Sequence, residues 1–211
     1  MARRSRSDGE ATRARILAAA GQRIAAQGLE QTTSTEIAAL AGVDLATINH
    51  HFGTRAGLYQ ALLAEAHRRF IDATALERLA VSRAPAGDKL KSLIRMVIGS
   101  QAIGTRWPML VLAREVVAPS PHLALLQTEQ ILPKLQHVLA ILAEMTGLLP
   151  DDPRLWRCLP CVVAPCALLV LARQTASPIG TRLSAGPEGE IVDQLYRFMR
   201  AGLMAIAAPQ G

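Results

Sequence analysis

The side chains with the clearest chemical potential stand between residues 33 and 55, where hydroxyl, amide, imidazole and guanidinium groups follow one another closely. Threonine hydroxyls near helix N-termini suit phosphate oxygens, because the helix dipole favours an anion there. Asn49 and His50 can donate to phosphates or base edges, while Leu45 and Ala46 offer only apolar contact, for example to a thymine methyl group. These residue types are able to contact nucleic acid.

Three cysteines form a second group with chemical potential. Cys158 and Cys161 have a Cys-x-x-Cys spacing that also occurs in metal and redox sites, and Cys166 follows them. A closed zinc site needs four ligands and no histidine lies near in the sequence, so we interpret the three as apolar residues of a core or interface helix. No nucleophile–base pair, phosphate-binding glycine loop or metal motif stands out. We therefore predict no catalytic residues, no metal, no cofactor and no enzymatic activity.

Short helices are needed to position the polar groups of residues 33–55. Residues 12–27 predict a first helix, because their apolar residues recur at helical spacing and Gly28 can cap the end. Thr33-Ser34-Thr35-Glu36 has the pattern of a capping box, which opens a second helix through about Leu40.

Two further helices follow a break at residues 41–43. Asp44 can cap a third helix that ends near His51, and Thr54 can cap a fourth that runs to around Ala80. Two short capped helices separated by a turn that contains Gly42 have the spacing of a helix-turn-helix. The second of the pair is short enough to enter a DNA major groove about 12 Å wide.

The rest of the chain is more apolar and shows no alternating strand pattern and no internal repeat. The predicted helices are one that Asp88 starts, then 108–118, 123–145 with a bend at Pro133, 154–174 and 188–207, with a loop over 175–187. The sequence therefore predicts an all-α protein.

Composition sets the remaining bounds. The chain has 211 residues, of which 50% are hydrophobic and 3% aromatic, so aliphatic side chains must pack the core. The formal net charge of +6 suits a polyanionic partner without establishing one. No apolar stretch reaches the length that a membrane helix needs, since the longest candidate, residues 158–172, is too short and contains prolines. The basic N-terminus lacks the apolar segment of a secretory signal. We expect a cytoplasmic protein that does not enter a membrane, with residues 1–11 as a disordered basic arm.

Residues 32–59 resemble the DNA-binding signature of TetR-type transcriptional regulators, and the spacing holds across three helices and two turns. This resemblance implies an N-terminal three-helix helix-turn-helix DNA-binding domain over residues 12–56 and a helical C-terminal ligand-binding and dimerisation domain over residues 57–211. It also implies repression that a small molecule relieves.

In proteins of this type, the starts of the second and fourth helices and the recognition helix touch DNA. Carried onto this sequence, the resemblance implies DNA-binding roles for Thr33, Thr35, Leu45, Ala46, Thr47, Asn49, His50, Thr54 and Arg55. Two of these depart from the common pattern: Asn49 stands where a tyrosine is usual, and Arg55 replaces the usual lysine.

The body is similar to the CecR-type (YbiH-type) subgroup of these regulators. The similarity rests on Leu112-Ala113-Arg114-Glu115, Pro119-Ser120-Pro121, Pro150-Asp151-Asp152-Pro153-Arg154 and the run from Ile48 to Gly53. It implies a body that senses a small apolar or drug-like ligand. Candidate pocket residues are Met96, Trp107, Met109, Arg114 and Trp156, although core packing, or an ion pair between Arg114 and Glu115, explains them equally well.

We therefore predict a homodimer that binds a double-stranded DNA operator and responds to a small ligand. Residues 154–174 and 188–207 are each long and apolar on a wide face, so they suit a four-helix interface between two copies. The alternative is a helical small-molecule-binding protein or enzyme whose helix-turn-helix is only structural.

Overall fold

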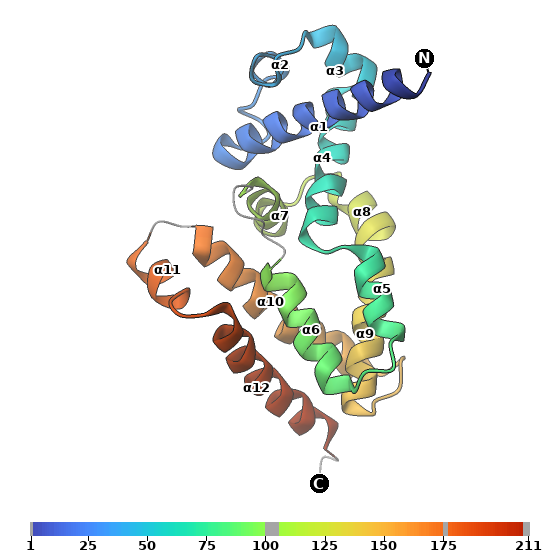
Figure 1. Ribbon diagram of the computed structural model, residues 1–211, viewed down its shortest axis with the longest axis vertical. Coiled ribbons are helices and arrows are strands. Elements are labelled where there is room, and N and C mark those ends of the chain that lie inside the picture. The colour runs from blue at the N-terminus through green and yellow to red at the C-terminus, as the bar shows by residue number, and fades with distance from the viewer. Residues whose placement is uncertain (1, 100–105, 175–176, 209–211) are drawn as a thin grey trace. The chain divides into compact units, whose positions relative to one another are not determined.

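The fold is all-α, as the sequence predicts. It is a computed structural model that describes residues 2–99, 106–174 and 177–208, and each regular element in these ranges is a helix (Figure 1). The chain divides into two compact units, one formed by residues 1–69 and 105–130 and the other by residues 70–104 and 131–211.

The first unit contains the helix-turn-helix. Its helices are α1 (Ala2–Gln27), α2 (Ser34–Ala41), α3 (Leu45–Phe52), most of α4 (Arg55–Phe70), α7 (Trp107–Val117), α8 (Leu123–Leu126) and most of the π-helical segment η1 (Gln127–Ile131). Helix α1 packs against both α2 and α7. Because α7 packs on α1, residues 105–130 group with the N-terminal helices, whereas the sequence assigned them to a body over residues 57–211.

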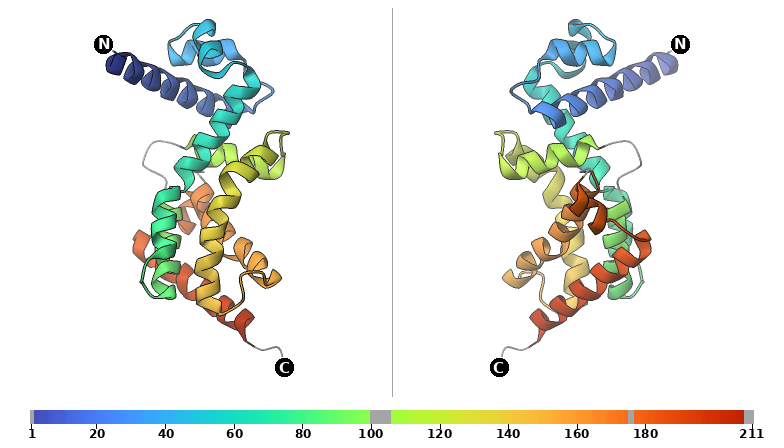
Figure 2. Two further views of the ribbon diagram at one scale, coloured as in Figure 1. Left: turned by 90° about the vertical axis from the view of Figure 1, so that its right-hand side faces the viewer. Right: turned by 90° about the vertical axis from the view of Figure 1, so that its left-hand side faces the viewer.

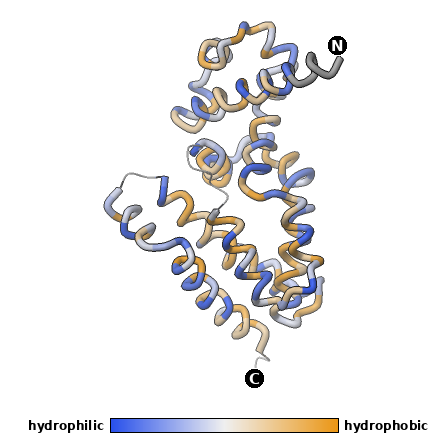
Figure 3. The backbone as a smooth tube through the Cα atoms, viewed as in Figure 1, coloured by the Kyte–Doolittle hydropathy of each residue, from blue (hydrophilic) through white to orange (hydrophobic). Residues whose placement is uncertain are grey.

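The second unit is a helical bundle with one continuous core. Its helices are α5 (Ala73–Val81), α6 (Ala86–Gly99), α9 (Leu132–Thr146), α10 (Pro153–Gln174), α11 (Pro178–Leu183) and α12 (Glu188–Ala207). Helices α6, α9, α10 and α12 all contact one another, and Figure 2 shows them side by side. Leu90, Ile94, Ile141, Leu142 and Leu155 are fully buried between them. Apolar and polar residues alternate along α6 and α12 (Figure 3), as expected for helices with one face on this core.

Three predicted boundaries differ from the structure. Helix α1 begins at Ala2, so the segment expected as a disordered arm is helical; its stretch contains no proline to stop the helix. The predicted helix from 54 to 80 is instead two helices, because the Asp72 side chain accepts from the Ala75 N–H and starts α5 anew. The predicted loop over 175–187 contains α11, which Ser177 caps; residues 175 and 176 lie outside the described part.

Helix α10 corrects the expectation that no segment reaches membrane length. It continues through Pro160 and Pro165 for 22 residues, and by length and composition alone it could cross a membrane. It is also a core helix of the second unit, where Leu155, Cys158 and Val162 are buried.

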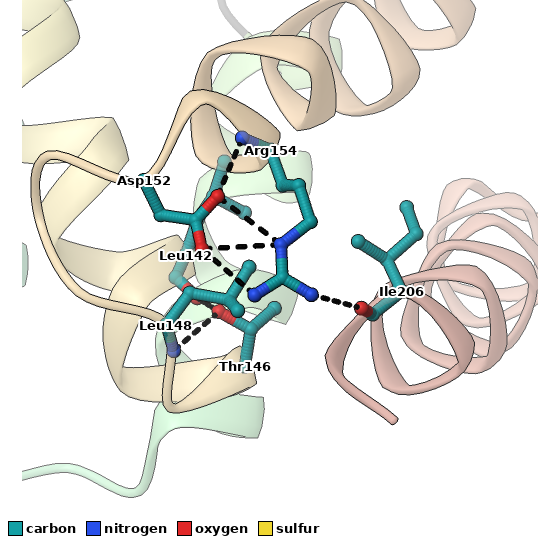
Figure 4. A network of polar contacts seen from close by, with 6 residues as sticks. All are labelled: Leu142, Thr146, Leu148, Asp152, Arg154 and Ile206. Atoms are coloured by element: carbon teal, nitrogen blue, oxygen red, sulfur yellow. Dashed lines mark hydrogen bonds and ion pairs between the residues drawn. The ribbon is translucent and has the colours of Figure 1, made fainter. Parts of the chain in front are cut away.

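A polar network ties the start of α10 to the end of α12 (Figure 4). The Asp152 carboxylate accepts from the Arg154 backbone N–H and from its guanidinium, each at 2.8 Å, and the same guanidinium donates to the Ile206 carbonyl at 3.4 Å. These hydrogen bonds from Arg154 hold the pKa of Asp152 below its usual value. One residue pair from the Pro150–Arg154 motif thus caps α10 and satisfies a carbonyl in the last turn of α12.

Candidate nucleic-acid interface

The capping box at the start of α2 is present as predicted. The Thr33 hydroxyl accepts from the Glu36 backbone N–H at 3.2 Å, and the Glu36 carboxylate accepts from the Thr33 N–H at 2.8 Å. Hydrogen bonds from Thr33 lower the pKa of Glu36. The Thr33 hydroxyl also donates to that carboxylate at 3.0 Å, so it is engaged within the helix start, whereas Thr35 is exposed.

The turn between α2 and α3 is fixed by a glycine and a cap. Gly42 has φ 64°, a left-handed conformation that favours glycine, and its N–H closes the end of α2. Asp44 then accepts from the Thr47 N–H at 2.7 Å, and hydrogen bonding from the Thr47 side chain, followed by that from its N–H, lowers the pKa of the Asp44 carboxyl. The turn and the cap set where α3 begins, and Thr47 is half-buried in its first turn.

One face of α3 is open to solvent. Each residue turns a helix by about 100°, so residues 45, 46, 49 and 50 fall within one arc, and Ile48 lies away from it. Leu45, Ala46, Asn49 and His50 are all exposed, and Ile48 is buried. The structure therefore brings these four predicted residues together on the side of α3 opposite its packed face.

The start of α4 is tied closely to its surroundings. The Thr54 hydroxyl accepts from the Gly57 N–H at 3.0 Å, which confirms Thr54 as a cap. The Arg55 guanidinium donates to the Leu29 carbonyl in the segment that joins α1 to α2. A Cβ on Gly57 would collide with the Phe52 carbonyl oxygen, so glycine permits α4 to start this close to the end of α3.

Several contacts in the first unit join residues far apart in sequence. The Tyr59 hydroxyl donates to the buried Glu115 carboxylate at 2.5 Å, and Ser120 donates to the same carboxylate through its N–H and its hydroxyl. Burial, followed by the bond to Glu115, raises the pKa of Tyr59. The Arg13 guanidinium lies over the Phe52 ring at 5.4 Å. Arg13 and Phe52 are 39 residues apart in the sequence, and Tyr59 and Glu115 are 56 residues apart. Sequence periodicity does not predict contacts over such separations.

The five candidate pocket residues divide between the two units. Trp107 and Met109 are buried in the first unit, and the exposed Arg114 donates to the carbonyls of Ala25 and Ala26 at the end of α1. Met96 and Trp156 belong to the second unit.

Met96 packs against the core of that unit, while Trp156 is half-exposed on α10. Arg114 and Glu115 each bond to other groups, since Glu115 accepts from Tyr59 and Ser120. Arg114 and Glu115 therefore hydrogen-bond to different partners, and they do not form with each other the ion pair that the sequence allowed.

The cysteines have different environments along α10. Cys158 and Cys166 are buried free thiols, in accord with a core role, while Cys161 is exposed and donates to the Arg157 carbonyl at 3.4 Å. Burial raises the pKa of Cys166 to about 11.

Comparison with known proteins decides the family. Residues 16–62 match the model for bacterial regulatory proteins of the tetR family. Residues 86–206, over half of the chain, match the C-terminal domain of the HTH-type transcriptional dual regulator CecR. The chain belongs to the TetR family of transcriptional regulators and carries a C-terminal domain of the CecR type.

One relative of known sequence matches part of this chain, and solved structures share its fold. The HTH-type transcriptional regulator TtgR of Pseudomonas putida is 42% identical over 67 residues, which cover 32% of this chain and 32% of TtgR. The match thus spans about a third of that relative. Two solved structures share the fold across most of the chain. The fatty acid degradation regulator FadR of Bacillus halodurans has 18% identity and a TM-score of 0.66, with 91% of this chain and 96% of that chain covered. AmtR of Mycobacterium smegmatis has 20% identity and a TM-score of 0.57, with 93% and 86% covered.

Proposed function

We propose that this TetR-family protein is a repressor that binds a double-stranded operator as a homodimer and is released by a small apolar or drug-like ligand. The observation that carries the proposal is the exposed face of α3, where Leu45, Ala46, Asn49 and His50 lie together beside two capped helix starts. A regulator of chromosomal genes works in the cytoplasm, where its operator is.

The contacts with DNA divide into positioning and reading. The first turns of α2 and α4 offer backbone N–H groups to phosphates, and the hydroxyls of Thr35 and Thr47 can add to them. Arg55 uses part of its guanidinium on Leu29 and keeps other donors for a phosphate. Asn49 and His50 carry the groups able to donate to base edges.

The proposed dimer uses the outward faces of α10 and α12. The exposed side of α10 carries Trp156, Cys161 and Leu168. On α12, Phe198 is 73% exposed. These two helices contact each other within the second unit, so the apolar residues exposed on both can contribute to one surface. Such a surface suits a four-helix interface with its counterpart.

Release by a ligand requires that the ligand bind one state more tightly than the other. In the state that represses, two copies of α3 must match half-sites about 34 Å apart. A ligand that favours any other spacing lowers operator affinity.

The first test is a gel shift on the DNA upstream of the protein's own gene, with a salt titration and excess nonspecific competitor. We expect a competitor-resistant shift that Asn49→Ala weakens by roughly five- to 150-fold, since a base contact contributes about 1–3 kcal/mol. Arg55→Ala should weaken binding to all sequences and reduce the salt slope by about one. Gln136→Ala, an exposed amide on α9, is the matched control. A shift that competitor abolishes would contradict operator recognition.

The dimer is tested by sedimentation of Phe198→Asp. A charge at this position should yield a monomer at concentrations where the wild type is dimeric. Val117→Asp places the same charge on a residue of α7 that is more exposed than Phe198, and it should leave the dimer intact. A wild-type monomer at micromolar concentration would refute the dimer.

A further inference from the structure

A groove runs along α4 within the first unit, and none of the five candidate pocket residues lines it. It has a volume of about 270 Å³ and lies between α4 and the α8–η1 segment. Gln60 and Ala64 line one side, and His122, Leu126 and Glu129 line the other. Its far wall includes π-helical residues, a geometry that occurs often at functional sites.

The charge of the lining indicates which ligands can enter. Glu129 contributes a carboxylate, and no lysine or arginine is among the lining residues that the structure describes. Glu129 is exposed and forms no ion pair within the described ranges. The Gln60 amide and the His122 Nδ1 lie 3.3 Å apart and add polar groups to the lining. A cation is attracted to this lining and an anion is repelled.

The volume of the groove and its apolar lining residues limit the size and polarity of the rest of the ligand. Leu63, Leu125 and Leu126 give it an apolar surface. A volume of 270 Å³ accommodates about nine water-sized groups, since each occupies about 30 Å³ in the liquid. We propose that this groove binds a small organic cation, a protonated amine on a short apolar body, with Glu129 facing the ammonium group.

The place of the groove gives binding a consequence for DNA. Gly57 lines it, and Gly57 also donates to the Thr54 hydroxyl and lies against the Phe52 carbonyl at the end of α3. A bound amine bridges α4 and η1 beside this corner and changes operator affinity. That consequence rests on the proposed operator binding, whereas the binding of the amine does not.

The test is titration calorimetry of the full-length protein, without DNA, using phenethylammonium as the probe and 3-phenylpropanoate as its anionic counterpart. We expect heat from phenethylammonium, none from 3-phenylpropanoate, and weaker binding as salt rises. Glu129→Gln should weaken phenethylammonium by about two- to fivefold, the effect expected of an exposed ion pair. Glu77→Gln removes the same charge from an exposed position on α5 and should have no effect.

Ala64→Leu provides a second variant, because the larger side chain fills the groove without changing its charge. It should abolish binding of phenethylammonium. The proposal is overturned if the wild type gives no heat at millimolar phenethylammonium, if Glu129→Gln binds as the wild type does, or if Ala64→Leu still binds. Because calorimetry needs no operator, heat from the amine without a gel shift would refute only the operator proposal, and a gel shift without heat would refute only the groove.

Discussion

Replacing Gly21 by alanine should destabilise the protein, although alanine favours helices. Gly21 lies in α1, and the Trp107 ring of α7 packs directly on it. A Cβ at position 21 would lie 2.7 Å from Trp107 Cε2 and closer still to Cδ2 and Cε3, where carbon atoms normally rest about 3.5–4.0 Å apart. The indole is 2% exposed and the Arg69 guanidinium lies over it at 5.3 Å, so the rigid ring has little room to move.

The magnitude follows from two opposed effects. Overpacking a core typically costs about 1–3 kcal/mol, and we expect about 3 kcal/mol here because the overlap involves three ring atoms. The better helix propensity of alanine offsets about 1 kcal/mol. The net loss of unfolding free energy should therefore be about 2 kcal/mol.

The assay is urea unfolding followed by circular dichroism and tryptophan fluorescence. Gly9→Ala is the matched control, since Gly9 lies in the same helix with nothing within 4 Å of its added Cβ, and it should gain up to about 1 kcal/mol. In a Trp107→Leu background, Gly21→Ala should lose its penalty. If Gly21→Ala is as stable as Gly9→Ala, or if its cost persists without the indole, the packing argument is refuted.

Three further predictions concern polar and thiol groups. Tyr59→Phe removes a donor from the buried Glu115 carboxylate and should cost about 1–3 kcal/mol in urea unfolding; an unchanged midpoint would contradict this. Because Arg154 lowers the pKa of Asp152, the stability from this pair is present above the ordinary Asp pKa and is lost as pH falls through the lowered value. The difference in melting temperature between wild type and Asp152→Asn should therefore shrink on acidification, and a constant difference would refute the linkage. Cys166, with a pKa of about 11 and a buried thiol, should resist iodoacetamide at about pH 8 until the protein unfolds, as mass spectrometry of labelled peptides can check; rapid native labelling would show that it is accessible.

The helix-turn-helix could be predicted because its signals are local. The capping box of Thr33 and Glu36, the left-handed Gly42 and the Asp44 cap each act within four residues, so their spacing in the chain fixes their geometry. The exposed face of α3 follows from helical periodicity once Ile48 is known to point inward.

Other boundaries were not predicted. The Asp72 cap that separates α5 from α4 is local, but Lys134 of α9 also donates to the Ile71 carbonyl just after α4, from 63 residues away. In the helix predicted over residues 123–145, Pro133 signals a bend in the sequence. The π-helical segment η1, which precedes Pro133, has no such signal and is seen only in the structure. The N-terminal helix extends to Ala2, although its charge pattern suggested an arm.

The sequence by itself determined the helical class, the helix-turn-helix motif and the family to which that motif points. These depend on periodicity, caps and turns that neighbouring residues define. Only the tertiary structure decided that α7 joins the N-terminal helices, because that grouping depends on the fit of Trp107 against Gly21 and on the bond of Tyr59 to Glu115. The same is true of the groove along α4, whose lining comes from segments some 60 residues apart. Contacts between distant residues require the folded chain to bring them together, and no local pattern encodes them.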